Sequence, residues 1–309
     1  MGLNERIVSK AGAIVTSGLV SGLLNPEQAR KFIQQTFEVT NLGGLVRHVM
    51  RTSKTGEIDK IGIGSRIVRK KTENTDDNYR AGVKTSQIEY ATTPVRLPWE
   101  ITEETLRENI EGQSLEKTIT DLMTRQLGID MEDLYLNGDV DVSSDDPDYD
   151  FLKINDGWIK QLANGSHVED RSSKNSGAMS VDVYYDALQQ IPNKYNNGRL
   201  RWLMSPRRKQ EWDRYLLKQI IEHGGGVPES IYKNPAAVPA VEVPSLSNDK
   251  IILTDPQNLI VVNTYSVKVR KTVEGKEAIM QDKRFYVAHL DYDPIIEELD
   301  AAAIITGLK

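Results

Sequence analysis

An extended segment that leads directly into one long helix constrains this chain more than any other feature. In the segment PVRLPWEIT, which begins at Pro94, apolar residues alternate with other residues in the period-two pattern of a strand. Pro94 and Pro98 each lack an amide donor, so the segment is predicted to be an edge strand rather than a central one.

The helix that follows is predicted from apolar residues at steps of three and four. Ser114 is the predicted N-cap, and Asn137-Gly138 is the predicted left-handed C-cap. A helix of about 23 residues would be roughly 34 Å long, which is unusual in a globular domain. Because no catalytic constellation accompanies it, this element indicates a structural building block. Its apolar positions are Leu115, Ile119, Leu122, Met123, Leu127, Met131 and Leu134.

Composition narrows the class of protein. Apolar residues make up 39% of the 309 residues and charged residues 27%, which is typical of a folded chain with a core. The sequence contains no cysteine. Disulfides, thiolate zinc sites and cysteine nucleophiles are therefore excluded together, and a reducing compartment would suit the chain.

The net charge of −6 hides an asymmetry along the chain. Residues 1–71 carry a net +7, whereas the remainder carries −13. This division predicts a basic segment that meets the acidic body of another copy. Nucleic-acid binding is the alternative, and it ranks second because aromatic residues do not interleave the basic ones.

The N-terminus superficially resembles a secretory signal, since Arg6 and Lys10 precede the apolar run AGAIVTSGLVSGLL. Polar residues and glycines interrupt the run, and Asn25-Pro26 follows it instead of a small-residue cleavage site. We interpret it as a loosely ordered arm and keep an export signal as the less favoured alternative. No stretch approaches the roughly 20 apolar residues that a membrane span needs, so a soluble protein is predicted.

A helix is predicted over residues 26–37, followed by a long charged hairpin between residues 46 and 93. Its two predicted strands, KIGIGSRIVRKK and VKTSQIEYATTP, hold too few large apolar side chains to form a core. Because an isolated two-stranded ribbon is only marginally stable, the hairpin is expected to lie on a neighbouring subunit.

The second half of the sequence predicts helices and strands in mixed order. A helix over 182–195 precedes the buried strand RLRWLMS, and Ser205-Pro206 begins a further helix. IILTDPQNLIVVN is predicted as strand, turn and strand. SVKVRKTV and MQDKRFYVAHL are predicted as a hairpin around Glu274-Gly275-Lys276, and a closing strand lies within residues 293–307. The class is α+β, without the rhythm of parallel βαβ units.

The loop between Asp139 and Asp150 is the best candidate for a cation site. Asp139 and Asp141 match the first two alternating ligands of a calcium loop, but Ser144 and Asp150 replace the glycine and glutamate expected at its sixth and twelfth positions. A solvated acidic loop is therefore the favoured interpretation.

Other apparent sites are weaker. Gly62-Ile63-Gly64-Ser65 lacks the lysine and the following helix of a phosphate-binding loop. Glu103 and Glu104, which resemble a catalytic pair, complement a helix dipole more simply. The histidines show no metal-binding spacing, and no serine elbow is present. No catalytic residue, metal or cofactor is predicted, and the chain is not expected to be an enzyme. The histidines are His48, His167, His223 and His289.

Taken in order, these pieces resemble the major capsid protein of tailed bacteriophages, whose fold is named after phage Hong Kong 97. PVRLPWEIT leads into a spine helix that ends in RQLGIDMEDLYLNGD, which looks like the family's helix terminus. DGWIKQL, RWLMSPRRKQEW and ILTDPQNLIVV resemble segments of the axial domain, and the late hairpin resembles part of the peripheral domain. The likeness covers nearly the whole chain, and its specificity comes from the order of the segments.

The resemblance implies an α+β, Hong Kong 97-like capsid fold with an N-terminal arm, an extended loop, a spine helix, and peripheral and axial domains. The expected divisions are the arm over 1–45, the extended hairpin over 46–93, the peripheral domain over 94–150 and 264–292, and the axial domain over 151–263 and 293–309. It also implies self-assembly into hexamers and pentamers of an icosahedral shell around double-stranded DNA, in the virion after assembly in the bacterial cytoplasm.

The expected partners are further copies of the chain, a portal, a separate scaffolding protein and packaged DNA held by non-specific contacts, with no membrane and no covalent cross-link. Candidate contacts between subunits join basic hairpin residues to acidic ones near the spine helix. An encapsulin-like nanocompartment shell is the alternative within the fold, and an enzyme or nucleic-acid-binding protein is the alternative outside it. The candidate interface residues are Arg66, Arg69, Lys70, Lys71, Glu103 and Glu104.

Overall fold

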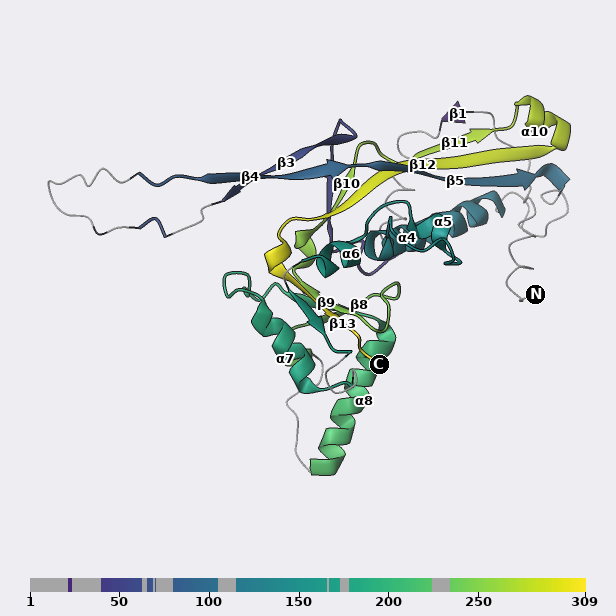
Figure 1. The fold of residues 1–309 in the computed structure, drawn as a ribbon. Coiled ribbons are helices and arrows are strands. Elements are labelled where there is room, and N and C mark those ends of the chain that lie inside the picture. Colours follow the sequence, from purple (N-terminus) through teal and green to yellow (C-terminus); the bar gives the residue numbers. More distant parts are fainter. Residues whose placement is uncertain are drawn as a thin grey trace.

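The computed structural model describes residues 22–23, 40–62, 66–68, 70, 80–104, 115–165, 167–172, 178–223 and 234–309. Figure 1 shows a body of sheet and helix, a two-stranded hairpin that projects from one end of the body, and a second layered part that lies below it. The predicted helix over 26–37 and the predicted N-cap Ser114 lie outside the described residues.

The body is built around one long strand, β12 (Lys283–Ile296), which is hydrogen-bonded along both of its edges. On one edge it pairs with β5 (Thr93–Thr102) from Lys283 to Tyr292. On the other edge it pairs first with β11 (Lys268–Thr272) and then with β10 (Leu259–Asn263). Two short strands, β1 (Gly22–Leu23) beside β11 and β2 (Arg47–Met50) beside β10, complete the six-stranded sheet.

Strand β5 confirms the predicted edge strand. Among the described strands it pairs only with β12, and Pro94 and Pro98 occupy exposed positions on it. The alternate residues are buried or half-buried, and Trp99 stacks on Tyr286 of β12 with ring centroids 5.3 Å apart. The period-two pattern therefore gives the correct inward face.

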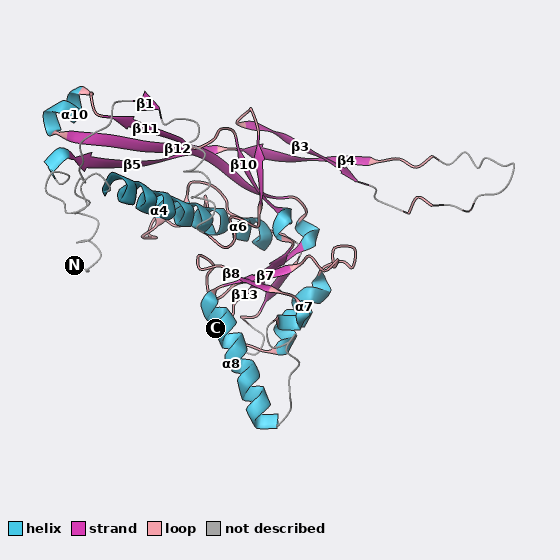
Figure 2. Cartoon of the chain, turned by 180° about the vertical axis from the view of Figure 1, so that it is seen from behind, coloured by secondary structure: helices cyan, strands magenta, loops and turns pink. Residues whose placement is uncertain are grey.

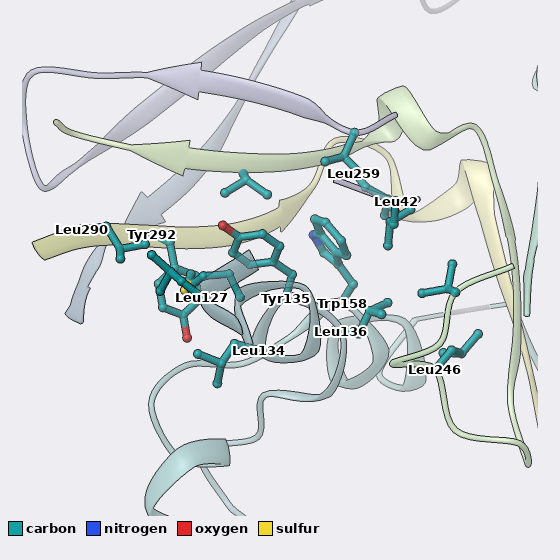
Figure 3. Packing of buried hydrophobic residues seen from close by; sticks show 14 of the residues in the cluster. Leu42, Leu127, Leu134, Tyr135, Leu136, Trp158, Leu246, Leu259, Leu290 and Tyr292 are labelled. Atoms are coloured by element: carbon teal, nitrogen blue, oxygen red, sulfur yellow. The ribbon is translucent and has the colours of Figure 1, made fainter. Parts of the chain in front are cut away.

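The predicted spine helix is α4 (Leu115–Asn137), which runs alongside β5 and β12 (Figures 1 and 2). The core between helix and sheet is rich in aromatic rings: Tyr135 lies 5.8 Å from Trp158 and 5.5 Å from Tyr292, measured between ring centroids (Figure 3). The Trp158 indole donates a hydrogen bond to the carbonyl of Ile295, 3.2 Å away, so the polar atom of this buried ring is satisfied.

The end of α4 differs from the predicted left-handed cap, because Gly138 does not have a positive φ. Instead, the chain returns and its backbone crosses the helix end: the Gly157 amide donates to the Gly138 carbonyl at 2.7 Å. A Cβ on Gly138 would lie 2.2 Å from the Asn155 carbonyl oxygen, and one on Gly157 would lie 2.6 Å from that of Leu136. Close approach of two backbones, and not a turn, explains both glycines.

The second layered part contains a five-stranded sheet in the order β6-β13-β9-β7-β8. Helices α7 and α8 pack with it around Tyr184, Trp202 and Trp212. The Ser205 hydroxyl accepts the Arg208 amide at 3.2 Å, which confirms the predicted start of α8. The elements are β6 (Val168–Asp170), α7 (Val181–Gln190), β7 (Arg201–Met204), α8 (Pro206–His223), β8 (Ala240–Glu242), β9 (Ile251–Thr254) and β13 (Ala302–Thr306).

The structure refines the sequence prediction in the second half of the chain. Helix α7 ends at Gln190 and not at residue 195, because the residue before Pro192 is driven out of the helical region. β9 and β10 are both strands, but they lie in different sheets, with the short helix η4 (Pro256–Asn258) between them. The late hairpin of β11 and β12 is confirmed, and helix α10 (Lys276–Gln281) occupies its turn.

Helices α5 (Tyr149–Leu152) and α6 (Trp158–Ala163) and the short helices η3 (Pro235–Ala237) and η5 (Leu299–Ala301) fill the connections. In the part of the chain that the structure describes, no helix combines the length and the apolar character needed to cross a membrane.

Replacing Gly157 by alanine is expected to lower the free energy of unfolding by at least about 1–3 kcal/mol, because the added methyl overlaps backbone atoms that cannot move independently. Thermal or urea unfolding would measure the loss. Gly44→Ala is the matched control, since a Cβ there meets nothing within 4 Å. Equal stability of the two variants would contradict the crossing geometry.

Candidate assembly surfaces

The hairpin consists of β3 (Thr55–Gly62) and β4 (Lys84–Ala91), which pair in register from Thr55 opposite Ala91 to Gly62 opposite Lys84. It projects beyond the body in both views (Figures 1 and 2). The first strand lies earlier than predicted, at 55–62 and not at 60–71. Residues 47–50, which were also predicted to belong to the hairpin, form β2 in the body sheet.

The base of the hairpin is held by an apolar cluster of its own subunit. Tyr90 packs with Ile260, Val262 and Ile295 of the body, and Ile58 and Ile88 are half-buried against the same cluster. Gly56 makes room for the aromatic ring, because a Cβ there would lie 2.8 Å from the Tyr90 hydroxyl oxygen. The expectation that the hairpin lies mainly on a neighbouring subunit is therefore wrong for its base, which packs on its own subunit.

Two buried aspartates of β12 fix the point where the hairpin joins the body. Asp293 accepts the Ala91 amide at 2.7 Å and the Asn155 side-chain amide at 3.0 Å. Asp291, which is fully buried, accepts the Thr264 amide at 2.8 Å and the Thr92 hydroxyl at 3.2 Å. Burial raises the pKa of Asp293 above the usual range of a carboxyl. Carboxylates that accept backbone amides at a strand junction are positioning groups, because their hydrogen bonds fix the chain's path.

Ion pairs add to this attachment. The Lys60 ammonium donates to the Glu297 carbonyl at 2.6 Å and pairs with the Glu298 carboxylate at 2.6 Å. Arg47 pairs with the Glu297 carboxylate at 2.8 Å. Two basic residues from the +7 segment are thus neutralised within the subunit and not by another copy.

The outer half of the hairpin has a different surface. Its described side chains combine exposed apolar groups, with Ile61, Val68 and Val83 exposed by 73%, 91% and 65%, and exposed basic groups. Arg66 and Lys70 are exposed, while Arg69 and Lys71 lie outside the described residues. Large apolar side chains that face solvent on a projecting ribbon are typical of a surface that another molecule covers.

The predicted acidic partners lie elsewhere. Glu103 pairs with Arg284 at 2.6 Å within the subunit, which ties the end of β5 to β12, whereas Glu104 is exposed. The hairpin projects from one end of the body, and the end of β5 lies at the other (Figure 1). A single subunit therefore does not bring Arg66 and Lys70 to Glu104, and contact between copies stays a prediction.

The acidic loop after α4 is organised around a lysine that the sequence analysis missed. The Lys160 ammonium lies 2.6 Å from Asp139, 2.6 Å from Asp141 and 3.0 Å from Asp156, measured to the nearest carboxylate oxygens. Its hydrogen bond lowers the pKa of Asp139 below the usual range. The ammonium thus stands where a bound cation would, and no metal-binding group of three or more ligands occurs among the described residues.

Another buried carboxylate joins distant segments to the spine helix. Glu132 of α4 accepts the Leu42 amide at 3.3 Å and the Ser245 hydroxyl at 3.3 Å. Burial raises the pKa of Glu132 above its usual range. Asn137, one turn further along α4, donates to the Ser245 carbonyl at 2.8 Å. These bonds hold the loops at residues 40–45 and 243–246 against the end of the helix.

Replacing Lys160 by methionine is expected to loosen the loop, because three carboxylates lose their shared counter-charge. Amide hydrogen exchange at Val140 and Asp141, whose amides are bonded to Asp156 and Asp139, should accelerate. Lys153→Met is the control, since Lys153 pairs with the exposed Asp150 and lies over the Tyr149 ring, away from the three carboxylates around Lys160. Unchanged exchange in the Lys160 variant would contradict the organising role of this ammonium.

The known proteins that this chain resembles are shell-forming proteins. No protein-family model matches the chain. YqbE of Bacillus subtilis (strain 168), provisionally named a prophage capsid protein, is 26% identical over 322 residues, which cover 99% of each chain.

Among solved structures, a chain of the satellite phage P4 procapsid that includes the size determination (Sid) protein matches with a TM-score of 0.69 and 15% identity, covering 100% of this chain and 98% of that one. A capsid chain of an empty GTA particle matches at 0.58 and 9% identity, covering 99% and 97%. The SrpI encapsulin of Synechococcus elongatus PCC 7942 matches at 0.51 and 12%, covering 100% and 96%.

The chain has the Hong Kong 97-like α+β capsid fold. The resemblance to the major capsid protein of tailed bacteriophages, predicted from the order of sequence segments, is confirmed. Encapsulin shells share this fold but match less well, with a TM-score of 0.51 against 0.69 for the procapsid chain.

Proposed function

We propose that this chain is a major capsid protein whose copies assemble into an icosahedral shell around phage double-stranded DNA. The observation that carries the proposal is the outer half of the hairpin, which presents apolar and basic side chains that its own subunit does not cover. The full-length likeness to a prophage capsid protein supports the same function. The role is structural and not enzymatic.

The two proposed domains of the capsid protein correspond to the two sheets. The six-stranded sheet with α4 forms the peripheral part, and the five-stranded sheet with α7 and α8 forms the axial part. β10 and residues 293–296 then join the peripheral part, because β10 is hydrogen-bonded to β12 and β2. Residues 1–45 are the proposed arm, and the hairpin, which begins after β2, is the proposed extended loop.

Further partners follow from a shell that holds DNA. Hexamers and pentamers of this chain would close the shell, a portal would admit DNA, and a separate scaffolding protein would guide assembly in the bacterial cytoplasm. DNA would be held by non-specific contacts, and the finished particle would be the virion. An encapsulin-like compartment is the second candidate, favoured only by the fold match to SrpI.

Purified protein is expected to form closed shells or capsomers, because the exposed outer hairpin needs a second copy. Sedimentation velocity and negative-stain microscopy, with and without a co-expressed scaffold, would detect them. A chain that remains monomeric at high concentration in both cases would overturn the proposal. Neighbouring terminase and portal genes would separate a phage shell from an encapsulin, which would instead hold a cargo enzyme.

The two halves of the hairpin are expected to differ in hydrogen exchange. In dissociated subunits, the amides of β3 and β4 near Ile58, Ile88 and Tyr90 should be protected, because the base packs on its own body. Amides near Val68 and Val83 should gain protection only on assembly. Mass spectrometry on dissociated and assembled protein measures both, and equal protection of the outer half in both states would contradict its role as a contact between copies.

A further inference from the structure

An anionic hollow lies at the base of the hairpin. It has a volume of about 460 Å³ and is open to solvent. Glu57 and Glu89 stand directly opposite each other in the strand register, and both are exposed. Neither carboxylate has a basic partner in the described part of the chain. The lining residues are Thr55, Gly56, Glu57, Glu89, Tyr90, Ala91 and Asp293.

This arrangement is unfavourable in an isolated subunit. Like charges directly opposite on neighbouring strands repel, and a third carboxylate, Asp293, stands in the wall behind them. Both oxygens of Asp293 are already occupied by hydrogen bonds to Ala91 and Asn155. The carboxylates of Glu57 and Glu89 are therefore the negative groups of the hollow that remain available to bind a cation.

The chemistry of the hollow favours an organic cation over a metal ion. No metal-binding group of three or more ligands is found among the residues that the structure describes. A guanidinium group matches two carboxylates well, because its planar fork can donate to both.

A basic surface of suitable character lies on the open face of the body sheet. Alternation places Trp99, Tyr286 and Ala288 on the side packed against α4, so their neighbours in sequence point to the other side. On that side Arg96, Lys268 and Arg270 are exposed; half-buried His289 lies between Arg96 and Lys268, and half-buried Val287 lies beside Arg270. Neither Arg96 nor Arg270 has an acidic partner within the described residues.

Within one subunit the two surfaces are separated along β12. The hollow lies beside Asp293, whereas Arg96 and Arg270 lie opposite His289 and Val287, four and six residues away. These separations are about 13 and 20 Å along the strand, longer than a salt bridge. Glu57 and Glu89 also occupy the face of the hairpin opposite to Ile58 and Tyr90, which contact the body.

We propose that the Glu57–Glu89 hollow of one copy receives Arg96 and Arg270 from the open sheet face of a second copy. The inference rests on the proposed function and specifies one contact that assembly uses. Because the two surfaces differ, the contact is heterologous, and its repetition around an axis generates a ring. It is distinct from the predicted contact of Arg66 and Lys70 with Glu104, which involves the outer half of the hairpin.

Charge reversal and its rescue test the contact. We would compare wild type, Glu57→Lys/Glu89→Lys, Arg96→Glu/Arg270→Glu, and the chain that carries all four changes. Each double variant should reduce the yield of rings and shells about tenfold or more, since a tenfold loss needs only about 1.4 kcal/mol. The fourfold variant restores opposite charges between copies and should recover most of the yield. Asp145→Lys/Asp148→Lys, in the exposed acidic loop, makes an equal charge change and should assemble normally.

The readouts are sedimentation velocity and negative-stain microscopy, with thermal unfolding to establish that each variant folds. Glu57→Gln/Glu89→Gln, which removes charge without reversing it, gives a milder version of the same test should a lysine variant fail to fold. Double variants that assemble like wild type, or a fourfold variant no better than either double, would overturn the contact while leaving the proposed function intact. A wild type that forms no assemblies would overturn the proposed function itself.

Discussion

The hydrogen bonding of β12 on both edges is the constraint on which the rest of the structure depends. Its first ten residues carry β5 and β11, and its last four carry β10, so one strand sets the register of the whole body sheet. The same strand supplies Asp291 and Asp293, which fix the hairpin, and Ile295, which packs under Tyr90. Displacing β12 would therefore disturb the body sheet, the attachment of the hairpin and the surface on which α4 packs.

Elements with a strong local pattern could be predicted from the sequence. The period-two alternation around Trp99 and the helical spacing from Leu115 to Leu134 each report a single buried face, and both are correct. The order of these elements was enough to indicate the capsid fold. Pairing between distant segments was not accessible in the same way, because the separation of β9 and β10 into two sheets depends on strands far along the chain.

The candidate surfaces were predicted less well, for a physical reason. Charge runs show where basic and acidic residues lie in sequence, but they do not show which of them are neutralised within the fold. Lys60 belongs to the basic segment that was predicted to meet another copy, and Glu103 was a candidate contact between copies, yet each pairs inside the subunit. The role of Lys160 could not be predicted from the sequence, because its partners Asp139 and Asp141 lie about twenty residues earlier and only the fold places them beside it. The charges left over after such pairing are the informative ones.

The positions of these unpaired charges depend on which faces of the hairpin and of the body sheet are packed. The hairpin's base lies on the body through the face that carries Ile58 and Tyr90, and on the opposite face Glu57 and Glu89 have no counter-charge among the described residues. Arg96 and Arg270, on the open sheet face, likewise have no acidic partner in the described part of the chain. Within the described subunit these opposite charges stay apart, about 13 to 20 Å along β12 from the hollow to the two arginines. In the proposed contact a second copy would neutralise them, and each added copy would present the same two surfaces again until a ring closes.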